Sequence, residues 1–233
     1  MLFDPTTIDW VFIIVVNIAL FASFYVPFLL RALKFGDWQR RKIGHMVLHT
    51  TLGIFPVFLR NLFDLLICLI IMVIIVIIIS LIPQIRFAPR IVEYTTRSGE
   101  PKLEMSLNAA LTATTVFVLL IIFIDRLYIY TGAVLALSLG DGLGEMIGRP
   151  LGRIKYKIIE QKSLEGSISV SIGIFIAILI GFSVNSMFDE IVYWKILVIS
   201  LVGTIFEALN YKFIDNITVP TSVALMLTLL FEL

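Results

Sequence analysis

The fold class is indicated by residues 65–82, LLICLIIMVIIVIIISLI, where only Cys68 and Ser80 interrupt an aliphatic run. An uncharged stretch of this length can cross the hydrocarbon core of a bilayer as one α-helix. The chain is 59% hydrophobic and 15% charged, whereas soluble domains have about 45–50% apolar and about 25% charged residues. We therefore expect an integral membrane protein with a single domain over residues 1–233, not a soluble domain with an anchor.

Further apolar segments of similar length predict an all-α, polytopic bundle of transmembrane helices. The eight predicted spans are Ile8–Leu30, Ile43–Leu59, Leu62–Ile82, Met105–Ile124, Leu127–Ile147, Leu164–Ser183, Ile191–Leu209 and Ile217–Leu230. The second and the last are short, so a bundle of seven spans is an alternative. The sequence contains no internal repeat and no linker that would indicate a second domain.

The basic residues are unevenly divided between the loops that connect these spans. All but three of the 18 Lys and Arg residues fall in alternate loops, and the exceptions are Arg60, Arg126 and Lys195. Because basic loops stay in the cytoplasm, we expect these loops to be cytoplasmic and both termini to be external. Polar residues gather at the same ends of the spans, namely His45, Asn108, Asp141, Glu145, Glu165, Glu207 and Asp215. Ionisable groups within membranes are costly and mostly functional, so we expect an active site at the cytoplasmic face.

Residues 138–169, SLGDGLGEMIGRPLGRIKYKIIEQKSLEGSIS, combine glycines, acids and basic residues between two predicted spans. Counted from Leu127 at about 1.5 Å per residue, Asp141 lies about 21 Å into a hydrocarbon core about 30 Å thick. A carboxylate at that depth needs a cation or a water-filled cavity. Asp141 and Glu145 share one face of a helix, and two carboxylates suit Mg²⁺, which takes its other ligands from phosphate and water. The pattern predicts a magnesium site at these two acids.

The glycines around the acids have two interpretations. They are Gly140, Gly142, Gly144 and Gly148. Without side chains they would let a ligand approach the backbone closely. The alternative is glycine-mediated helix packing, with Asp141 paired to an arginine. Packing explains the glycines but not two acids at depth, so we favour a ligand site.

A basic loop, residues 149–157, is followed by Lys162-Ser163-Leu164-Glu165-Gly166-Ser167 at the start of the sixth span. The start of a helix presents free N–H groups and a positive dipole, which bind phosphate. The alternative is that Ser163 is an N-cap, that Glu165 compensates the dipole and that the basic residues only mark the cytoplasmic side. Together with the acidic pair, the loop predicts a site for a nucleoside triphosphate at the cytoplasmic membrane surface.

These motifs together resemble the membrane-embedded CTP-dependent lipid-alcohol kinases, which include dolichol kinase, phytol and farnesol kinase, and the yeast-type diacylglycerol kinase. The residues that carry the resemblance are Gly140-Asp141, Gly148-Arg149-x-x-Gly152, Lys162-Ser163-x-Glu165-Gly166-Ser167, Arg41-Lys42-x-x-His45, and Glu207 with Asp215-Asn216-x-Thr218-Val219-Pro220. The match covers about residues 41–220. Eukaryotic dolichol kinases carry many additional amino-terminal spans, so the shorter phytol-kinase type fits this chain better in size.

The resemblance implies phosphoryl transfer from CTP, with Mg²⁺, to a long-chain isoprenoid alcohol of the dolichol, polyprenol or phytol type. The acids implied in catalysis are Asp141, Glu165 and Asp215, with Glu207 and Asn216 as further site residues. The nucleotide contacts expected from the basic loop and the motifs are Gly140, Gly148, Arg149, Gly152, Arg153, Lys155, Lys162, Ser163, Gly166, Ser167, Arg41, Lys42 and His45. The expected partners are CTP, the lipid alcohol and membrane lipids, with no nucleic acid.

Three other functions fit parts of this pattern. A diacylglycerol-type lipid kinase or a CTP-phosphatidate cytidylyltransferase could use the same acids and basic residues. A transporter with acids at a broken helix is a non-enzymatic alternative, but its polar residues would lie near the midplane. His45 and His49 form only a weak zinc pattern, and we expect His49 to be a buried, hydrogen-bonded histidine.

Overall fold

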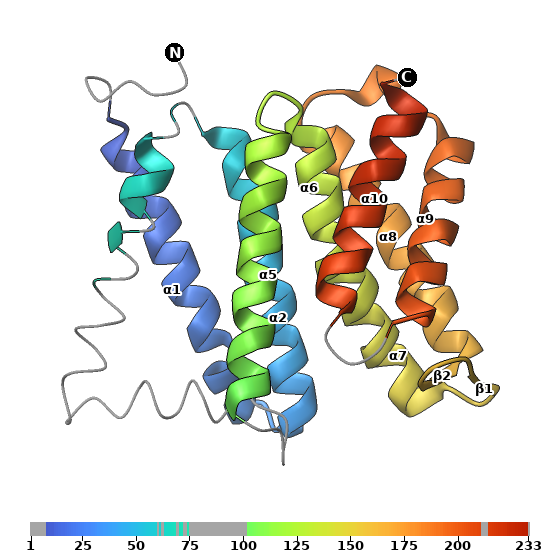
Figure 1. Ribbon diagram of the computed structural model, residues 1–233. Helices are drawn as coiled ribbons and strands as arrows, with labels where there is room; N and C mark the ends of the chain where they lie inside the picture. Colours follow the sequence, from blue (N-terminus) through green and yellow to red (C-terminus); the bar gives the residue numbers. More distant parts are fainter. Residues whose placement is uncertain are drawn as a thin grey trace. The chain divides into compact units, whose positions relative to one another are not determined.

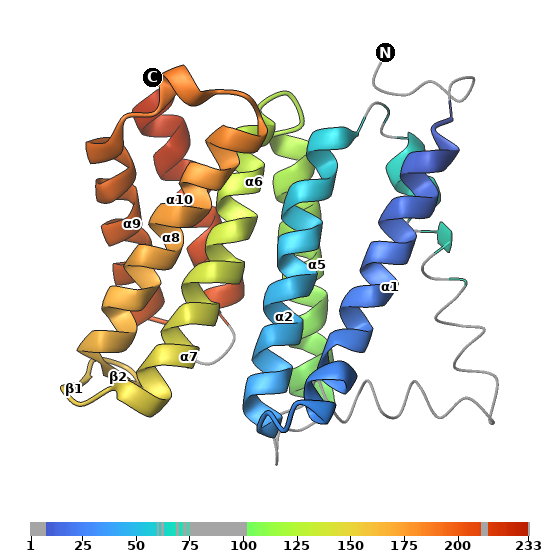
Figure 2. The same ribbon diagram turned by 180° about the vertical axis from the view of Figure 1, so that it is seen from behind.

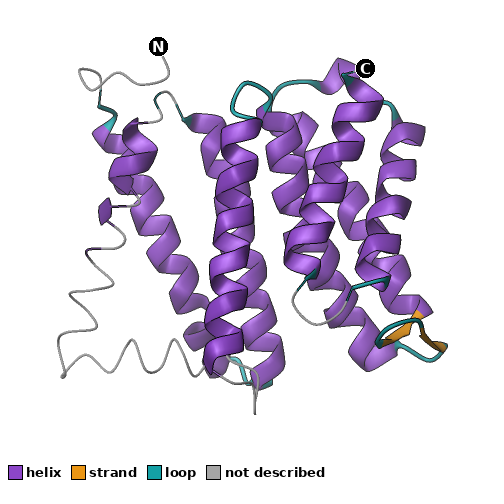
Figure 3. Ribbon diagram, viewed as in Figure 1, coloured by secondary structure: helices purple, strands orange, loops and turns teal. Residues whose placement is uncertain are grey.

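The computed structural model describes residues 8–59, 61, 63–68, 70, 71, 74, 102–210 and 214–232. Over these residues the chain is mostly helical, as expected from the apolar segments (Figure 3). It divides into two compact units, residues 1–44 with 58–100, and residues 45–57 with 101–233. The candidate site lies in the second unit.

The first unit contains α1 (Trp10–Ala32), which matches the first predicted span. The helix begins after Asp9, whose carboxylate accepts a hydrogen bond of 3.0 Å from the backbone N–H of Phe12. This contact satisfies one of the amide groups left free at a helix start. The predicted span Leu62–Ile82 falls largely outside the described residues, of which 63–68 are helical.

The next helix, α2 (Asp37–Ile54), continues from the first unit into the second. It begins before the predicted Ile43 and ends before the predicted Leu59, where a 3-10 turn, Phe55–Phe58, follows. Pro56 explains the early end, because proline has no N–H to donate and restricts the residue before it.

The rest of the second unit consists of helices and one small hairpin. Its elements are α5 (Lys102–Ile122), α6 (Leu127–Leu135), the π-helix η2 (Ala136–Asp141), α7 (Gly142–Leu151), β1 (Lys155–Lys157), β2 (Gln161–Ser163), α8 (Leu164–Val184), the 3-10 turn η3 (Phe188–Glu190), α9 (Tyr193–Ala208) and α10 (Asp215–Phe231). α8 packs against α6, η2, α7 and α9, while α10 packs against α5, α6 and α9 (Figures 1 and 2). These helices begin and end within about one turn of the predicted spans.

Among the residues that the structure describes, three helical segments are long and apolar enough to cross a membrane. They are Trp10–Ala32, Leu127–Leu151 and Leu164–Val184. Ala110–Ile122 and α10 are apolar but shorter. The structure therefore confirms a helical protein with segments of membrane-spanning character, and the total of seven or eight spans stays a prediction.

Candidate functional site

A row of glycines brings α6, η2 and α7 into backbone contact with α8. The facing pairs are Gly132 and Gly181, Gly140 and Gly173, and Gly148 and Gly166. The contact is tightest at Gly173, where an added Cβ would lie 2.5 Å from the carbonyl oxygen of Leu139. Close approach through small residues is the usual way in which membrane helices pack. We call these three pairs the glycine seam.

Close packing also surrounds Gly144, which the sequence assigned to ligand access, and Gly152, which it assigned to nucleotide contact. A Cβ at Gly144 would lie 2.5 Å from Val170 Cγ2, and one at Gly152 would lie 2.4 Å from Ser163 Oγ. Helix packing, the alternative drawn from the sequence, therefore accounts for Gly144, while Gly152 packs against Ser163 at the start of α8. Nucleotide contacts from Gly140, Gly148, Gly152 and Gly166 stay a prediction.

The π-helix η2 carries Asp141 at its end, next to the glycine seam. π-helical turns are rare and often occur at functional sites. Inside η2, the buried Ser138 donates a hydrogen bond of 2.7 Å to the carbonyl oxygen of Met46 and lies 2.9 Å from Thr50 Oγ1. η2 is thus held from one side by α8 and from another by residues of α2, and Asp141 is half-buried.

Asp141 and Glu145 lie one turn apart in a helical segment that runs unbroken from Leu127 to Leu151, so they share a face as predicted. Glu145 also forms an ion pair of 2.8 Å with Arg149, and the Glu145 side chain is 13% exposed. The described residues contain no group of three His, Cys, Asp or Glu side chains that could hold a metal. The donor chemistry fits Mg²⁺ bound together with a phosphate, because two carboxylates would supply protein oxygens and the phosphate the others.

The basic loop contains a structure that the sequence did not predict. β1 and β2 form an antiparallel hairpin in which Tyr156 pairs with Lys162. Glu165 holds the chain before the hairpin, since its Oε1 accepts hydrogen bonds from the backbone N–H of Arg153 at 3.0 Å and of Ile154 at 3.2 Å. Anchoring of the loop backbone is therefore one role of the Glu165 carboxylate.

Ser163 and Tyr156 connect the hairpin to the start of α8. Ser163 Oγ accepts a hydrogen bond of 3.2 Å from the N–H of Gly166, which confirms the N-cap alternative for this residue. The Tyr156 hydroxyl lies 2.5 Å from Ser167 Oγ. Sequence reasoning missed Tyr156, whose only signal was its place within the basic loop.

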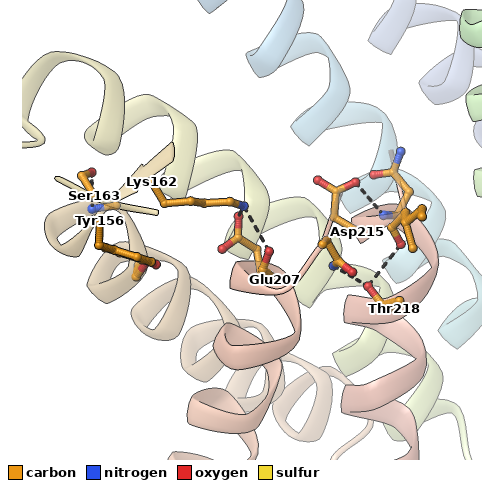
Figure 4. A network of polar contacts seen from close by, with 11 residues as sticks. Tyr156, Lys162, Ser163, Glu207, Asp215 and Thr218 are labelled. Carbon is orange, nitrogen blue, oxygen red and sulfur yellow. Dashed lines mark hydrogen bonds and ion pairs between the residues drawn. The ribbon is translucent and has the colours of Figure 1, made fainter. Parts of the chain in front are cut away.

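Lys162 joins the hairpin to the end of α9. Its Nζ forms an ion pair with the carboxylate of Glu207 and donates a hydrogen bond of 3.0 Å to the carbonyl oxygen of the same residue. The side chains are 20% and 9% exposed. Figure 4 shows the Lys162 side chain extending from the hairpin to Glu207. A phosphate at Lys162 would compete with this carboxylate.

A second polar cluster lies where α9 ends and α10 begins. The Asp215 carboxylate accepts a hydrogen bond of 2.9 Å from the N–H of Asn216, whose side-chain amide donates one of 2.6 Å to Asn108 Oδ1 on α5. The side chain of Asn210 donates to the hydroxyl of Thr218 (Figure 4). Sequence reasoning identified Asp215, Asn216 and Asn108 as polar residues at helix ends but missed Asn210, which lies at a similar place.

The predicted Arg41-Lys42-x-x-His45 motif lies on α2. The rings of His45 and His49 are 4.0 Å apart, and His49 Nδ1 lies 2.8 Å from the carbonyl oxygen of His45. His49 is 3% exposed, so it is the buried, hydrogen-bonded histidine that we expected. Arg41 and Lys42 belong to the first unit, and their contacts with a nucleotide stay a prediction.

The second unit thus places acids, basic residues and a short hairpin at the ends of apolar helices. Comparison with known proteins gives no relative, because no family model, no curated protein and no solved structure matches the chain. The kinase resemblance therefore rests on the sequence motifs, and the geometry around them is the basis for a functional hypothesis.

Proposed function

We propose that this chain is a CTP-dependent kinase that phosphorylates a membrane isoprenoid alcohol of the dolichol, polyprenol or phytol type and releases CDP. In this proposal the protein has seven or eight spans, external termini and a cytoplasmic hairpin. The observation that carries the proposal is that Asp141 and the Glu145–Arg149 pair lie on one apolar helical segment, which leads directly into the basic hairpin and the start of α8.

The acceptor is proposed to be a lipid because the helices beside these polar groups are aliphatic on their exposed faces. Exposed apolar side chains of α8 and α9 include Ile168, Ile172, Ile176, Leu197 and Leu201. A lipid alcohol would therefore reach the site laterally through the membrane, and CTP would arrive from the cytoplasm.

Phosphoryl transfer depends mostly on positioning and on neutralising phosphate charge. Mg²⁺ held by Asp141 and Glu145 would supply part of that neutralisation. Arg149, exposed by 51%, could turn from Glu145 to a phosphate oxygen when the acid takes up the metal. The Lys162 ammonium group would likewise leave the Glu207 carboxylate and bind a phosphate oxygen. Arg153 and Lys155 would add positive charge on the loop.

A base is needed to accept the proton of the lipid hydroxyl. Glu165 already accepts hydrogen bonds from two loop amides, and this arrangement suits it to positioning the loop. The Asp215 carboxylate accepts a hydrogen bond from the N–H of its neighbour Asn216 at the start of α10 and takes no part in anchoring the loop that Glu165 holds. We therefore assign proton transfer to Asp141 or Asp215 in preference to Glu165.

The reaction is tested with CTP labelled on its terminal phosphorus, the purified full-length protein, Mg²⁺ and a panel of lipid alcohols. Label in the lipid fraction supports the kinase, and label only in pyrophosphate indicates a cytidylyltransferase instead. Asp141→Asn should lower Mg²⁺-dependent turnover by about a hundredfold or more, because it removes charge from the reacting centre. Asp189→Asn, at an exposed acid of η3, is the matched control and should leave turnover unchanged.

A further inference from the structure

The turn of the β1–β2 hairpin, residues 158–160, carries two exposed aliphatic side chains beside the half-buried acid Glu160. We define the hairpin tip as Lys157, Ile158 and Ile159, of which the two isoleucines are 56% and 45% exposed. Tight turns normally use Gly, Asn, Asp, Ser or Pro, which supply the required backbone geometry. Further exposed aliphatic residues lie on either side of the hairpin, at Leu151, Ile154 and Leu164. The turn alone does not explain so much exposed apolar surface.

The hairpin occupies a place where a bilayer would meet it. It connects Leu127–Leu151 to Leu164–Val184, two segments of membrane-spanning character. Strands of three residues extend only about 10 Å, and the headgroup layer on each side of a bilayer is about 5–7 Å thick. Figures 1 and 2 show the hairpin beside the last turn of α7, extending sideways from the helices of its unit. If these two segments cross the bilayer, the tip therefore stays at the depth of the membrane surface.

Contacts at the base of the hairpin hold the tip in place. The Glu165 carboxylate binds the chain before β1, and Lys162 ties β2 to Glu207. Tyr156 contacts Ser167 at the start of α8. These contacts engage Tyr156 and Lys162 at the base of the hairpin, and the two isoleucines lie exposed at its far end.

The basic residues around the hairpin tip indicate which kind of membrane surface it would bind. The exposed basic residues on and beside the hairpin are Arg149, Arg153, Lys155 and Lys157. Basic residues attract the anionic phospholipids of a membrane surface, and apolar residues between them insert at the boundary with the acyl chains. We propose that the hairpin tip inserts into the headgroup layer of a bilayer that contains anionic phospholipids, with Ile158 and Ile159 at the acyl boundary and Lys157 at the lipid phosphates.

The proposal does not depend on the kinase reaction and is tested by the depth of the tip. The full-length Cys68→Ser protein receives one cysteine at Ile159, is labelled with an environment-sensitive fluorophore and is reconstituted in phosphatidylcholine vesicles with or without phosphatidylserine. Gln161→Cys, on the exposed part of β2, is the matched control. Quenching by shallow lipid nitroxides should be about twofold or more stronger at Ile159 than at Gln161, and quenching by aqueous iodide correspondingly weaker.

The dependence on anionic lipid tests the role of the basic side chain. Phosphatidylserine should deepen the label at Ile159, and Lys157→Gln should remove most of that effect. Equal quenching at Ile159 and Gln161 in both kinds of vesicle would overturn the proposal. Protection of Ile159 from both quenchers, with disulfide formation between copies of the Ile159→Cys protein, would also overturn it and would identify a second chain as the occupant.

Discussion

Gly173→Ala tests whether the glycine seam fixes the position of η2. The added Cβ would lie 2.5 Å from the carbonyl oxygen of Leu139, 2.7 Å from its carbonyl carbon and 2.9 Å from Gly140 Cα. Ordinary contact begins at 3.4 Å, so the two backbones must separate by about 0.9 Å. All three atoms belong to η2 backbone, and no flexible side chain can rotate to make room.

The free energy of this change is the difference between two opposing effects. Overpacking of a close-packed interior costs about 1–3 kcal/mol. Replacing glycine by alanine within a helix returns about 0.8–1.0 kcal/mol of intrinsic helix stability. Because the clash is with backbone, we place the cost in the upper half of its range and expect a net loss of about 1–2 kcal/mol of unfolding free energy.

The assay is thermal unfolding of the detergent-solubilised protein, followed by circular dichroism. At about 2–4 °C per kcal/mol for a chain of this size, Gly173→Ala should lower Tm by about 2–8 °C. Gly53→Ala is the matched control, since the atoms nearest to its Cβ would be side-chain atoms of Leu135 and Val134 at an ordinary contact distance of 3.4 Å. The control should keep or raise Tm through the gain in helix stability. A Tm for Gly173→Ala at or above that of the unmodified protein would refute the reasoning.

Three further predictions concern the hairpin and its orientation. A double-mutant cycle with Lys162→Met and Glu207→Gln measures the coupling free energy of this ion pair from unfolding. We expect about 1 kcal/mol, because the pair is only partly exposed to solvent. A value near zero would show that the ion pair does not fix the hairpin. Tyr156→Phe removes one hydroxyl contact and should speed hydrogen exchange of the hairpin amides by about fivefold, corresponding to about 1 kcal/mol, with no change expected in α10. In a cysteine-free protein, single cysteines at Lys157 and Asn185 should react with an impermeant thiol reagent from opposite sides of the membrane. If a cysteine at Lys157 is labelled from outside intact cells, the proposed site has no access to cytosolic CTP.

The helices of the second unit could be predicted because long apolar runs and local caps determine them. α8 was predicted as Leu164–Ser183 and extends over Leu164–Val184, with Ser163 capping its start as a serine in this position should. The end of α2 was less predictable, since the apolar run continues through the proline that stops the helix.

The hairpin and the π-helix could not be predicted from local sequence. Ile158 and Ile159 give no turn signal, and the strands are too short for an alternating pattern. Contacts with residues distant in sequence stabilise the hairpin, such as the ion pair between Lys162 and Glu207. The π-helix likewise lies where Gly173 of α8 closely approaches its backbone, a contact between residues distant in sequence.

Glycine packing and an acidic ligand site were alternatives in the sequence, yet the structure allows both in one helix. Gly140 and Asp141 are adjacent in the chain, and the side chains of consecutive helical residues point in different directions. Gly140 faces α8, where a Cβ would lie 2.9 Å from Ile174, while Asp141 is half-buried at the start of α7. Close packing at the glycine therefore sets the position of the acid that follows it. If Asp141 acts in phosphoryl transfer, Gly173→Ala should lower turnover even at temperatures where the protein is fully folded. If Asp141 is purely structural, turnover of Gly173→Ala should fall only at temperatures near its Tm, where the protein unfolds.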